Sequence, residues 1–246
     1  NGEYRLLQAC ISALSTSRAI VVFDIGANKG EWSQQALSAA RVHGAGLSVH
    51  AFEPASDTYA YLLRKFEDAG VVLNKAAASD KSAQVPLYIK GSLCGVNSLY
   101  GREGAEVELV EAVALDDYVS QQGIESIDFI KTDAEGHDIH VMFGAEQTLR
   151  DARVEIWQFE YNHRWIEGRH YLKDVFEYIA DKPYMIGKLH RTGIEIFEAW
   201  HPELERFFES NYVLIRRDCG WISKFLMPVG FDYRNVLVPR QDIVRQ

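Results

Sequence analysis

The chain has 246 residues, of which 35 are acidic and 26 are basic, so its formal net charge is −9. Hydrophobic residues make up 47% of the chain, which is enough to bury a sizeable core and argues against intrinsic disorder. The acidic balance argues against a broad nucleic-acid-binding face, because such a face needs clustered Lys and Arg. No apolar run approaches the ~18 residues of a membrane span.

The chain contains three cysteines, Cys10, Cys94 and Cys219. They are too few and too scattered for a disulfide scaffold. No spacing of Cys and His residues is typical of a zinc site. A reducing compartment is the default interpretation, so we expect a cytoplasmic protein.

The first third of the chain alternates short apolar runs with amphipathic segments. Residues 19–25 (AIVVFDI) form a β-rich apolar run that ends at a glycine-containing loop, as is typical of a buried parallel strand. The other elements predicted here are a helix over 31–43, a strand over 47–53, a helix over 58–68 and a strand over 71–77.

The next segment departs from this alternation. Apolar and polar residues alternate over 85–89 and again over 107–113, and a glycine-rich loop, residues 91–104, lies between them. The pattern predicts a strand, a long loop and a strand inserted into the fold. A loop of this length in a compact domain is usually functional or mobile.

Strand and helix signals then alternate again up to Arg217. The predicted elements are a helix over 115–122, a strand over 127–132, a helix over 137–149, a strand over 154–160, a helix over 172–180, strands over 184–189 and 194–199, a helix over 202–209 and a strand over 212–216. Such alternation predicts an α/β fold with a doubly wound, mostly parallel sheet. Ligands of such sheets bind beyond the carboxyl ends of the strands.

We predict one domain over residues 1–217, with an N-terminal helix before the sheet. The tail, residues 218–246, is rich in aromatic residues without periodicity. We expect this tail to pack on the domain or on a partner, which makes a homodimer plausible.

The first strand leads into the loop DIGANKG, residues 24–30. Gly26 and Gly30 permit a tight turn, and the following helix directs free N–H groups at a ligand. The middle glycine of the dinucleotide fingerprint is missing at position 28. Asp24 suits a cation, such as an amino group, better than a phosphate. An ordinary strand–turn–helix junction with glycines for packing is the alternative.

Carboxylates also follow the next two strands. Glu53, roughly twenty residues after the glycine turn, can accept hydrogen bonds from both hydroxyls of a ribose. A lone Glu at a strand end is more often a solvated charge, but Asp24 and Glu53 fall on neighbouring strand ends. Together they favour a nucleoside without a diphosphate, such as S-adenosylmethionine. Asp80 could accept a hydrogen bond from an adenine amino group, or it could belong to a simple Ser-Asp turn.

The fourth strand ends in the densest cluster of ionisable residues, KTDAEGHD, residues 131–138. Helix capping explains Glu135 and Asp138 but not the other ionisable residues. The cluster could supply a general base, metal ligands or a contact to an ammonium group. Aromatic residues near the expected mouth could stack on a sugar or belong to the core: Tyr100, Tyr161, Trp165 and Tyr171.

These segments resemble the class I S-adenosylmethionine-dependent methyltransferases, and more closely the FkbM-type methyltransferases. The resemblance extends from about Val21 to Glu160 and does not cover the acceptor end. The matching segments are FDIGANKG (23–30), AFEP (51–54), AASD (77–80), VNSL (96–99), ALDDY (114–118), IDFIKTDAEGHD (127–138) and FGAEQTL (143–149).

The resemblance implies a seven-stranded Rossmann-like sheet whose last strand is antiparallel. It implies O-methylation of a hydroxyl on a sugar, glycan or natural product. By position, Asp24 and Gly26 would contact the methionine part, Glu53 the ribose and Asp80 the adenine. Asp133 would lie near the methyl group, and Asn97 and Ser98 near the methionine carboxylate or the acceptor. The full set of expected cofactor-binding residues is Asp24, Gly26, Ala27, Asn28, Glu53, Pro54, Ser79, Asp80, Ser98 and Asp133.

An alcohol is a poor nucleophile while protonated, so a general base or a metal is expected. Candidate bases are Asp133, His137 and His163. The ordinary pKa of histidine, ~6.5, suits His137 to neutral pH, although a solvent-facing helix residue is the alternative. Asp133 with Glu135 and Glu160 could instead hold Mg²⁺, which prefers oxygen ligands.

Two other function classes stay open. A nicotinamide or flavin oxidoreductase could use the same sheet, but the missing dinucleotide fingerprint counts against it. A non-catalytic binding domain could retain the fold, but acidic residues at four strand ends count against it. Nucleic-acid methylation is disfavoured by the net charge. The expected partner is therefore a small-molecule or glycan acceptor, with no nucleic acid.

Overall fold

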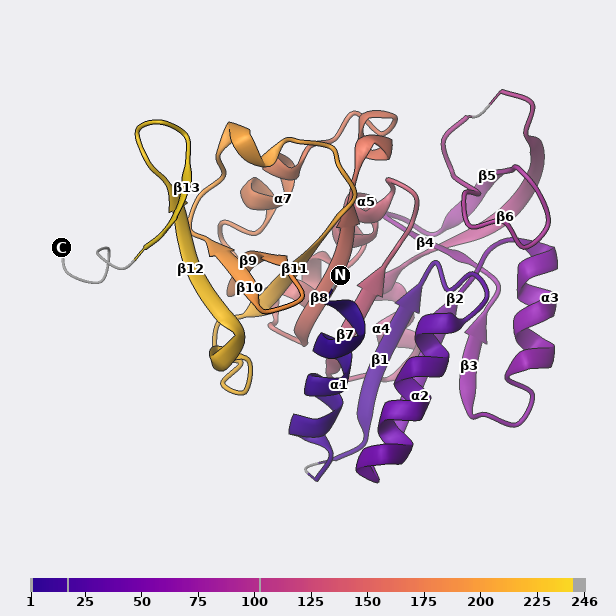
Figure 1. Cartoon of the computed structure of the whole chain (residues 1–246). Coiled ribbons are helices and arrows are strands. Elements are labelled where there is room, and N and C mark those ends of the chain that lie inside the picture. Colours follow the sequence, from indigo (N-terminus) through magenta and orange to yellow (C-terminus); the bar gives the residue numbers. More distant parts are fainter. Residues whose placement is uncertain (1, 17, 102, 241–246) are drawn as a thin grey trace.

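The computed structural model describes residues 2–16, 18–101 and 103–240. Within them, the main sheet has ten strands in the order β13-β12-β10-β9-β11-β8-β7-β1-β2-β3. Helices α1 (Glu3–Leu14) and α2 (Glu31–His43) pack on one face and lie in front of the sheet in Figure 1. Helices α4 (Leu115–Gln122), α5 (Asp138–Phe143), α6 (Glu146–Arg150) and α7 (Leu172–Tyr178) pack on the other face. The doubly wound α/β fold is confirmed.

Five neighbouring strands of this sheet are parallel, with the order β3-β2-β1-β7-β8. They are β1 (Ile20–Ile25), β2 (Leu47–Phe52), β3 (Val71–Asn74), β7 (Ile127–Thr132) and β8 (Val154–Tyr161). All six residues of β7 are buried, as expected for a strand covered by helices on both faces. The chain passes from β1 to β2 on one side and returns to β7 on the other, so the strand order reverses between β1 and β7. Ligands of open α/β sheets bind at such a reversal.

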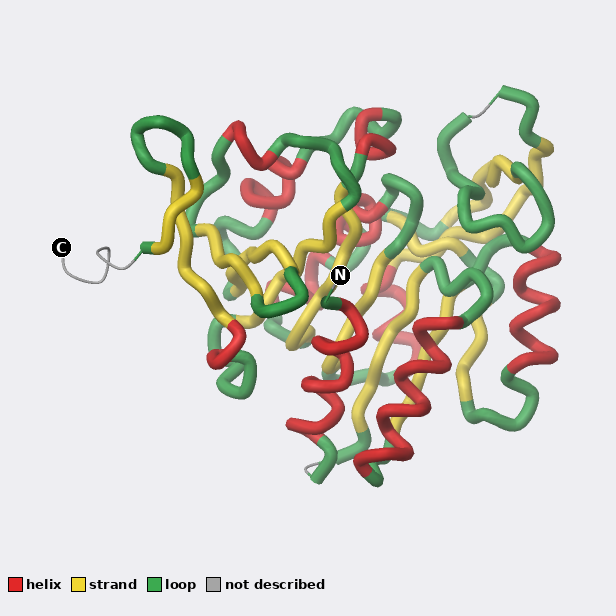
Figure 2. The backbone as a smooth tube through the Cα atoms, viewed as in Figure 1, coloured by secondary structure: helices red, strands yellow, loops and turns green. Residues whose placement is uncertain are grey.

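The other half of the sheet has mixed directions. It comprises β9 (Tyr184–Leu189), β10 (Ile194–Phe197), β11 (Ser210–Arg216), β12 (Leu226–Phe231) and β13 (Leu237–Pro239). Strand β11 inserts between β8 and β9 and is antiparallel to both, which makes it the expected antiparallel last strand. The sheet has three strands more than the seven expected, because β10, β12 and β13 extend its edge (Figure 2).

The predicted insertion forms a separate three-stranded sheet. Its strands are β4 (Ala77–Ser79), β5 (Ala83–Ile89) and β6 (Glu106–Ala114), in the order β4-β6-β5. The single strand predicted over 71–77 is therefore two strands, since β3 belongs to the main sheet and β4 to the small one. Helix α3 (Ser56–Lys65) lies beside them (Figure 1).

Two predicted helices differ from the structure. The helix expected over 137–149 is interrupted at Gly144, where a Cβ atom would come 1.9 Å from the carbonyl oxygen of Ser79. The helix expected over 202–209 is only the 3₁₀ turn η2 (Pro202–Leu204), because Phe207 has a left-handed backbone with φ of 51°. Two further 3₁₀ turns are η1 (His163–Ile166) and η3 (Ser223–Phe225).

The described part of the chain contains no helix that is both long and apolar enough to cross a membrane. Its three cysteines are all free thiols, and Cys10 and Cys219 are buried.

Candidate active site

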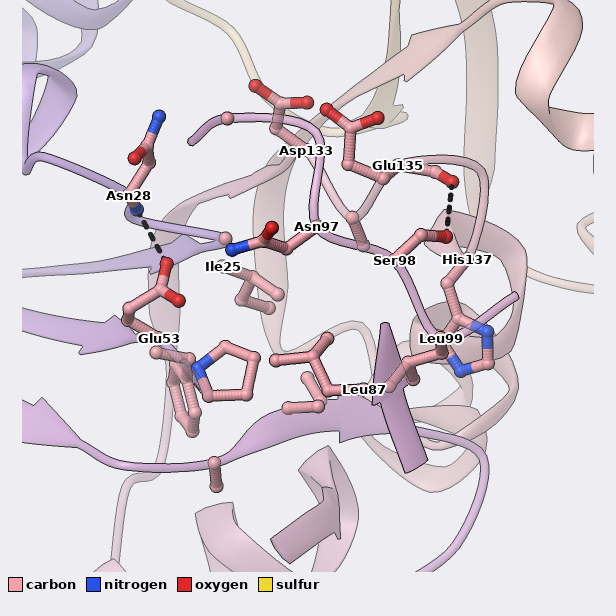
Figure 3. A pocket seen from close by; sticks show the side chains of 18 of the residues that line it. Ile25, Asn28, Glu53, Leu87, Asn97, Ser98, Leu99, Asp133, Glu135 and His137 are labelled. Carbon is pink, nitrogen blue, oxygen red and sulfur yellow. Dashed lines mark hydrogen bonds between the residues drawn. The ribbon is translucent and has the colours of Figure 1, made fainter. Parts of the chain in front are cut away.

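A pocket of about 590 Å³ lies at the carboxyl ends of β1, β2 and β7, next to the reversal of strand order. Figure 3 shows Glu53 and Asn28 on one side, Asp133 and Glu135 at the top, and Leu87 with Leu99 below. The ends of β1, β2 and β7 and the loops after them supply one part of the lining. The inserted segment supplies another part, which is Leu87, Cys94, Gly95, Asn97, Ser98 and Leu99.

Glu53 is the carboxylate held most firmly in the pocket. Its Oε2 accepts the backbone N–H of Asn28 at 2.9 Å, and its Oε1 accepts that of Ala55 at 2.9 Å. Burial raises the pKa of Glu53 to about 7, against the two hydrogen bonds, which lower it. The glycine turn that delivers Asn28 needs a left-handed backbone at Gly26, with φ of +74°. Gly26 also packs so closely that a Cβ atom there would lie 2.1 Å from the carbonyl oxygen of Asp133.

Asp24 does not line the pocket. It is fully buried below it, where its Oδ2 accepts hydrogen bonds from the Ser33 hydroxyl at 2.6 Å and the Ser33 amide at 3.1 Å. Its Oδ1 lies 3.8 Å from the Lys131 ammonium. Burial raises the pKa of Asp24, while Lys131 and Ser33 act against this shift. Asp24 thus anchors α2 and balances a buried lysine, instead of facing a bound amino group directly.

Lys131 connects this buried carboxylate to the pocket. Its Nζ lies 3.2 Å from Asp133 Oδ2, and the Asp133 side chain is 41% exposed at the pocket rim. Burial alone would lower the pKa of Lys131, but Asp133 and Asp24 together raise it above its usual value. The lysine is therefore charged and holds the Asp133 carboxylate in place at the end of β7.

His137, a candidate general base, is not the solvent-facing residue that was the alternative. Its side chain is buried, its Nε2 lies 2.9 Å from the Ser79 hydroxyl, and its Nδ1 lies 3.3 Å from the Tyr100 hydroxyl. Burial, with the neighbouring His140, lowers its pKa to about 3. The argument for His137 as a base at neutral pH relied on an ordinary histidine pKa, which His137 does not have. Both of its ring nitrogens already have hydrogen-bond partners.

The three carboxylates considered for Mg²⁺ do not converge. Asp133 pairs with Lys131, Glu135 forms an ion pair with Arg164, and Glu160 accepts a hydrogen bond from the Asn162 amide at 2.7 Å. Among residues 2–16, 18–101 and 103–240, no group of three or more Asp, Glu, His or Cys side chains is placed to hold a metal ion. The structure gives no support to the Mg²⁺ hypothesis.

The inserted loop closes the pocket from the side of the small sheet. Ser98 forms two backbone hydrogen bonds with Tyr88, at 2.8 and 3.2 Å, and its hydroxyl donates to the Glu135 carbonyl at 3.5 Å (Figure 3). The Asn97 side-chain oxygen accepts the backbone N–H of Lys90 at 3.0 Å. Asn97 and Ser98 thus both line the pocket.

Several predicted site residues do not line the pocket. Ala27 and Ser79 are buried behind it, and Ser79 bonds to His137. Asp80 is exposed and accepts a hydrogen bond from Ser79 at 3.0 Å. His163 is exposed on η1. The predicted residues that do line the pocket are Gly26, Asn28, Glu53, Pro54, Ser98, Asp133 and His137.

Sequence analysis missed the apolar half of the pocket. A slot beside Glu53 is formed by side chains from β1, β2, β4, β5 and the inserted loop: Ile25, Phe52, Ala77, Ala78, Leu87 and Leu99. The alternation over 85–89 does place Leu87 on the inner face, but nothing in the sequence indicates which site that face meets. Of the aromatic residues proposed to stack on a ligand, Tyr161 and Trp165 belong to the core, and Tyr171 is 46% exposed.

The methyltransferase FkbM domain matches residues 24–186, which is more than half of the chain. No curated protein sequence is similar enough to count as a relative.

Similar solved structures include three methyltransferases. The CurJ carbon methyltransferase is 12% identical, with a TM-score of 0.47, and the match covers 87% of this chain and 54% of that one. The METTL16 methyltransferase domain is 9% identical, with a TM-score of 0.47, and the match covers 87% of this chain and 66% of that one. A human methyltransferase 10 domain containing protein is 8% identical, with a TM-score of 0.45, and the match covers 88% of this chain and 81% of that one. This chain spans about half the length of the CurJ chain. On the strength of the domain match, the chain belongs to the FkbM methyltransferase domain family.

Proposed function

We propose that the pocket binds S-adenosylmethionine and that the enzyme transfers its methyl group to a hydroxyl of a sugar, glycan or natural-product acceptor. The observation that carries the proposal is an apolar slot with one buried carboxylate at its side, Glu53, and a second at its rim, Asp133. A nucleoside with a cationic substituent has the matching chemistry. When bound, S-adenosylmethionine supplies an electrophilic methyl group.

The residues of the pocket fit this cofactor. The slot beside Glu53 suits an adenine ring, and the Glu53 carboxylate can accept the ribose hydroxyls. The side-chain oxygen of Asn28 is buried in the pocket lining and has no hydrogen-bond partner among the described residues. This oxygen is a free acceptor for a ligand donor, such as an ammonium group. In our proposal Gly26, Pro54 and Ser98 complete the walls, while Asp24, Ala27 and Ser79 support them from behind.

Asp133 is the proposed proton acceptor. Its carboxylate is fixed by Lys131 and reaches solvent, so an acceptor hydroxyl can approach it from the open side of the pocket. Removing the hydroxyl proton makes the oxygen nucleophilic when the methyl group is within reach. His137 is a weaker candidate because of its lowered pKa, and it is better suited to tying β4 to the inserted loop.

Calorimetry tests the cofactor proposal directly. We expect micromolar binding of S-adenosylmethionine and S-adenosylhomocysteine and no binding of NADH. Glu53→Ala should weaken binding by roughly 10- to 100-fold, because two hydrogen bonds to a charged group are lost. Glu111→Ala, which removes an exposed glutamate of β6, is the matched control. A folded protein that binds neither methionine nucleoside would contradict the proposal.

A second experiment tests the class of acceptor. The enzyme is incubated with methyl-labelled S-adenosylmethionine and panels of glycosides and phenolic natural products, and the labelled product is characterised by NMR. A methyl group on oxygen is expected. A methyl group on carbon or nitrogen would contradict the O-methyltransferase proposal while leaving the cofactor proposal intact.

A further inference from the structure

A second groove lies at the same carboxyl edge of the main sheet, beyond β8. It is lined by residues of β8 to β11, of the segment before β11, and of β12 and β13. We call it the β9–β11 groove. Aromatic side chains make up much of its wall: Tyr161, Phe197, Phe207, Phe208, Tyr212 and Phe231. Phe208 is 78% exposed and can offer its face to a ligand ring.

Five Lys, Arg, His and Glu side chains line this groove, and four of them form two pairs. His190 Nε2 lies 2.8 Å from Glu195 Oε2, and Arg206 Nη2 lies 2.7 Å from Glu203 Oε2. The side chain of Lys188 forms no hydrogen bond or ion pair with any residue that the structure describes, although Glu195 is its neighbour across β9 and β10. Its Nζ lies 5.9 Å from the centre of the Tyr212 ring, within cation–π distance. Burial lowers the pKa of Lys188, against the attraction of Glu195. The Lys188 ammonium therefore has hydrogen-bond donors available for an anionic group of a ligand.

We propose that the β9–β11 groove is an acceptor subsite for a ring compound that carries a carboxylate or a phosphate, with the Lys188 ammonium on the anionic group and Phe208 against the ring. This inference rests on the proposed function, since it concerns the acceptor of the same enzyme. It specifies the chemical class of the acceptor as anionic, because a neutral sugar could not form an ion pair with the Lys188 ammonium.

The strand registers give the distance from the methyl-transfer site. Thr132 pairs with Phe159, Glu160 pairs with Asn211, and Tyr212 pairs with Lys188. Asp133 and Lys188 are therefore at nearly the same level, three strand spacings apart. At ~4.8 Å a spacing, their backbones are separated by about 14 Å. This separation suits an acceptor of several linked rings, with its reacting hydroxyl at Asp133 and its anionic ring in the groove.

The test uses three probes that differ in one substituent: 4-nitrophenyl glucoside, 4-nitrophenyl glucuronide and 4-nitrophenyl glucoside 6-phosphate. Their binding to the full chain is measured by calorimetry in the presence of saturating S-adenosylhomocysteine. We expect at least one anionic probe to bind about tenfold more tightly than the neutral glucoside, as one charge-assisted contact allows. If the glucuronide is the probe with the higher affinity, the groove prefers a carboxylate, and if the 6-phosphate is, the groove prefers a phosphate.

Variants assign this preference to Lys188. Lys188→Met should remove it and Lys188→Arg should keep it. Lys224→Met, which removes an exposed lysine on η3, should change nothing. Equal binding of all three probes, no binding of any probe, or an anion preference that survives in Lys188→Met would overturn the inference. So would a Lys188-dependent dimer in sedimentation, which would give the groove to a second copy of the chain.

Binding of S-adenosylhomocysteine is measured first and separates the two proposals. If it binds normally and no anion preference is found, only the acceptor inference fails. If S-adenosylhomocysteine does not bind to the folded protein, both the proposed function and the acceptor inference fail. Normal binding by Lys188→Met also shows that this variant is folded.

Discussion

The pocket at the ends of β1, β2 and β7 and the β9–β11 groove lie at the same edge of one sheet, yet they are built in different ways. In the pocket, short loops that directly follow β1, β2 and β7 carry the polar groups, and backbone amides fix Glu53. In the groove, the lining comes from six separate stretches between Tyr161 and Leu237. The first arrangement can be recognised as local motifs. The second exists only after the mixed half of the sheet has assembled, so no single stretch of the sequence indicates it.

The largest effect is expected at the reacting end of the pocket. Asp133→Asn removes the proposed proton acceptor while keeping the shape of the side chain. Turnover should fall by roughly 10²–10⁴-fold, the usual contribution of general base catalysis, and S-adenosylhomocysteine affinity should change much less. Steady-state kinetics and calorimetry measure the two quantities. Asp68→Asn, at an exposed position after α3, is the control. Unchanged turnover would remove Asp133 from the mechanism.

The glycine turn of the pocket should be the most sensitive point for stability. Gly26→Ala places a Cβ atom against the carbonyl oxygen of Asp133 on a left-handed backbone, so we expect a loss of about 3 kcal/mol or more. Gly104→Ala is the matched control, because its φ is +69° and nothing lies within 4 Å of the added atom. Only the backbone cost of about 1 kcal/mol is expected there. Urea denaturation measures both, and equal losses would contradict the close packing of the turn.

A corresponding anchor supports the groove. The Glu205 carboxylate accepts hydrogen bonds from the Tyr161 hydroxyl, from Trp200 Nε1 at 2.7 Å, and from the backbone N–H groups of Leu172 and Lys173 at 3.3 and 2.9 Å. Glu205→Ala should destabilise the fold by about 2–3 kcal/mol, since the buried Tyr161 hydroxyl loses its partner. S-adenosylhomocysteine affinity should stay within about twofold of wild type. A large loss of affinity would show that the two regions are coupled.

The smallest effect is the contribution of Glu53 to the pH dependence of stability. The pKa of Glu53 is raised to about 7 in the folded protein from an ordinary value of 4.5. Between these two values the folded state binds more protons than the unfolded state, so the free energy of unfolding falls as pH rises from 4.5 to 7. After allowance for relaxation, we expect a fall of about 1–2 kcal/mol.

Denaturation at several pH values in the absence of ligand checks this expectation. Glu53→Gln should lack this part of the pH dependence, while a Glu205→Gln variant should retain it. A wild-type profile that coincides with that of Glu53→Gln would contradict the raised pKa.

Much of the pocket could be predicted from the sequence because each part depends on neighbouring residues. The glycine turn at 24–30, Glu53 after β2 and the cluster at 131–138 all follow strands whose apolar runs are plain. The pKa of His137 could not be predicted, since its burial depends on Ser79 and Tyr100, which are distant in the chain. The proposed role of Lys188 could not be predicted from the sequence for the same reason. This role depends on the pairing of its charged neighbours with one another, which only the tertiary structure sets.

The position of β11 has a consequence for synthesis of the chain. During translation β8 emerges long before β11, which must enter between β8 and β9 and pair with both. Until about residue 216 has left the ribosome, one edge of β8 and one edge of β9 carry unpaired backbone groups. Exposed edges of this kind invite pairing with other chains. The five parallel strands can assemble early, but the sheet becomes continuous only after β11 has been synthesised.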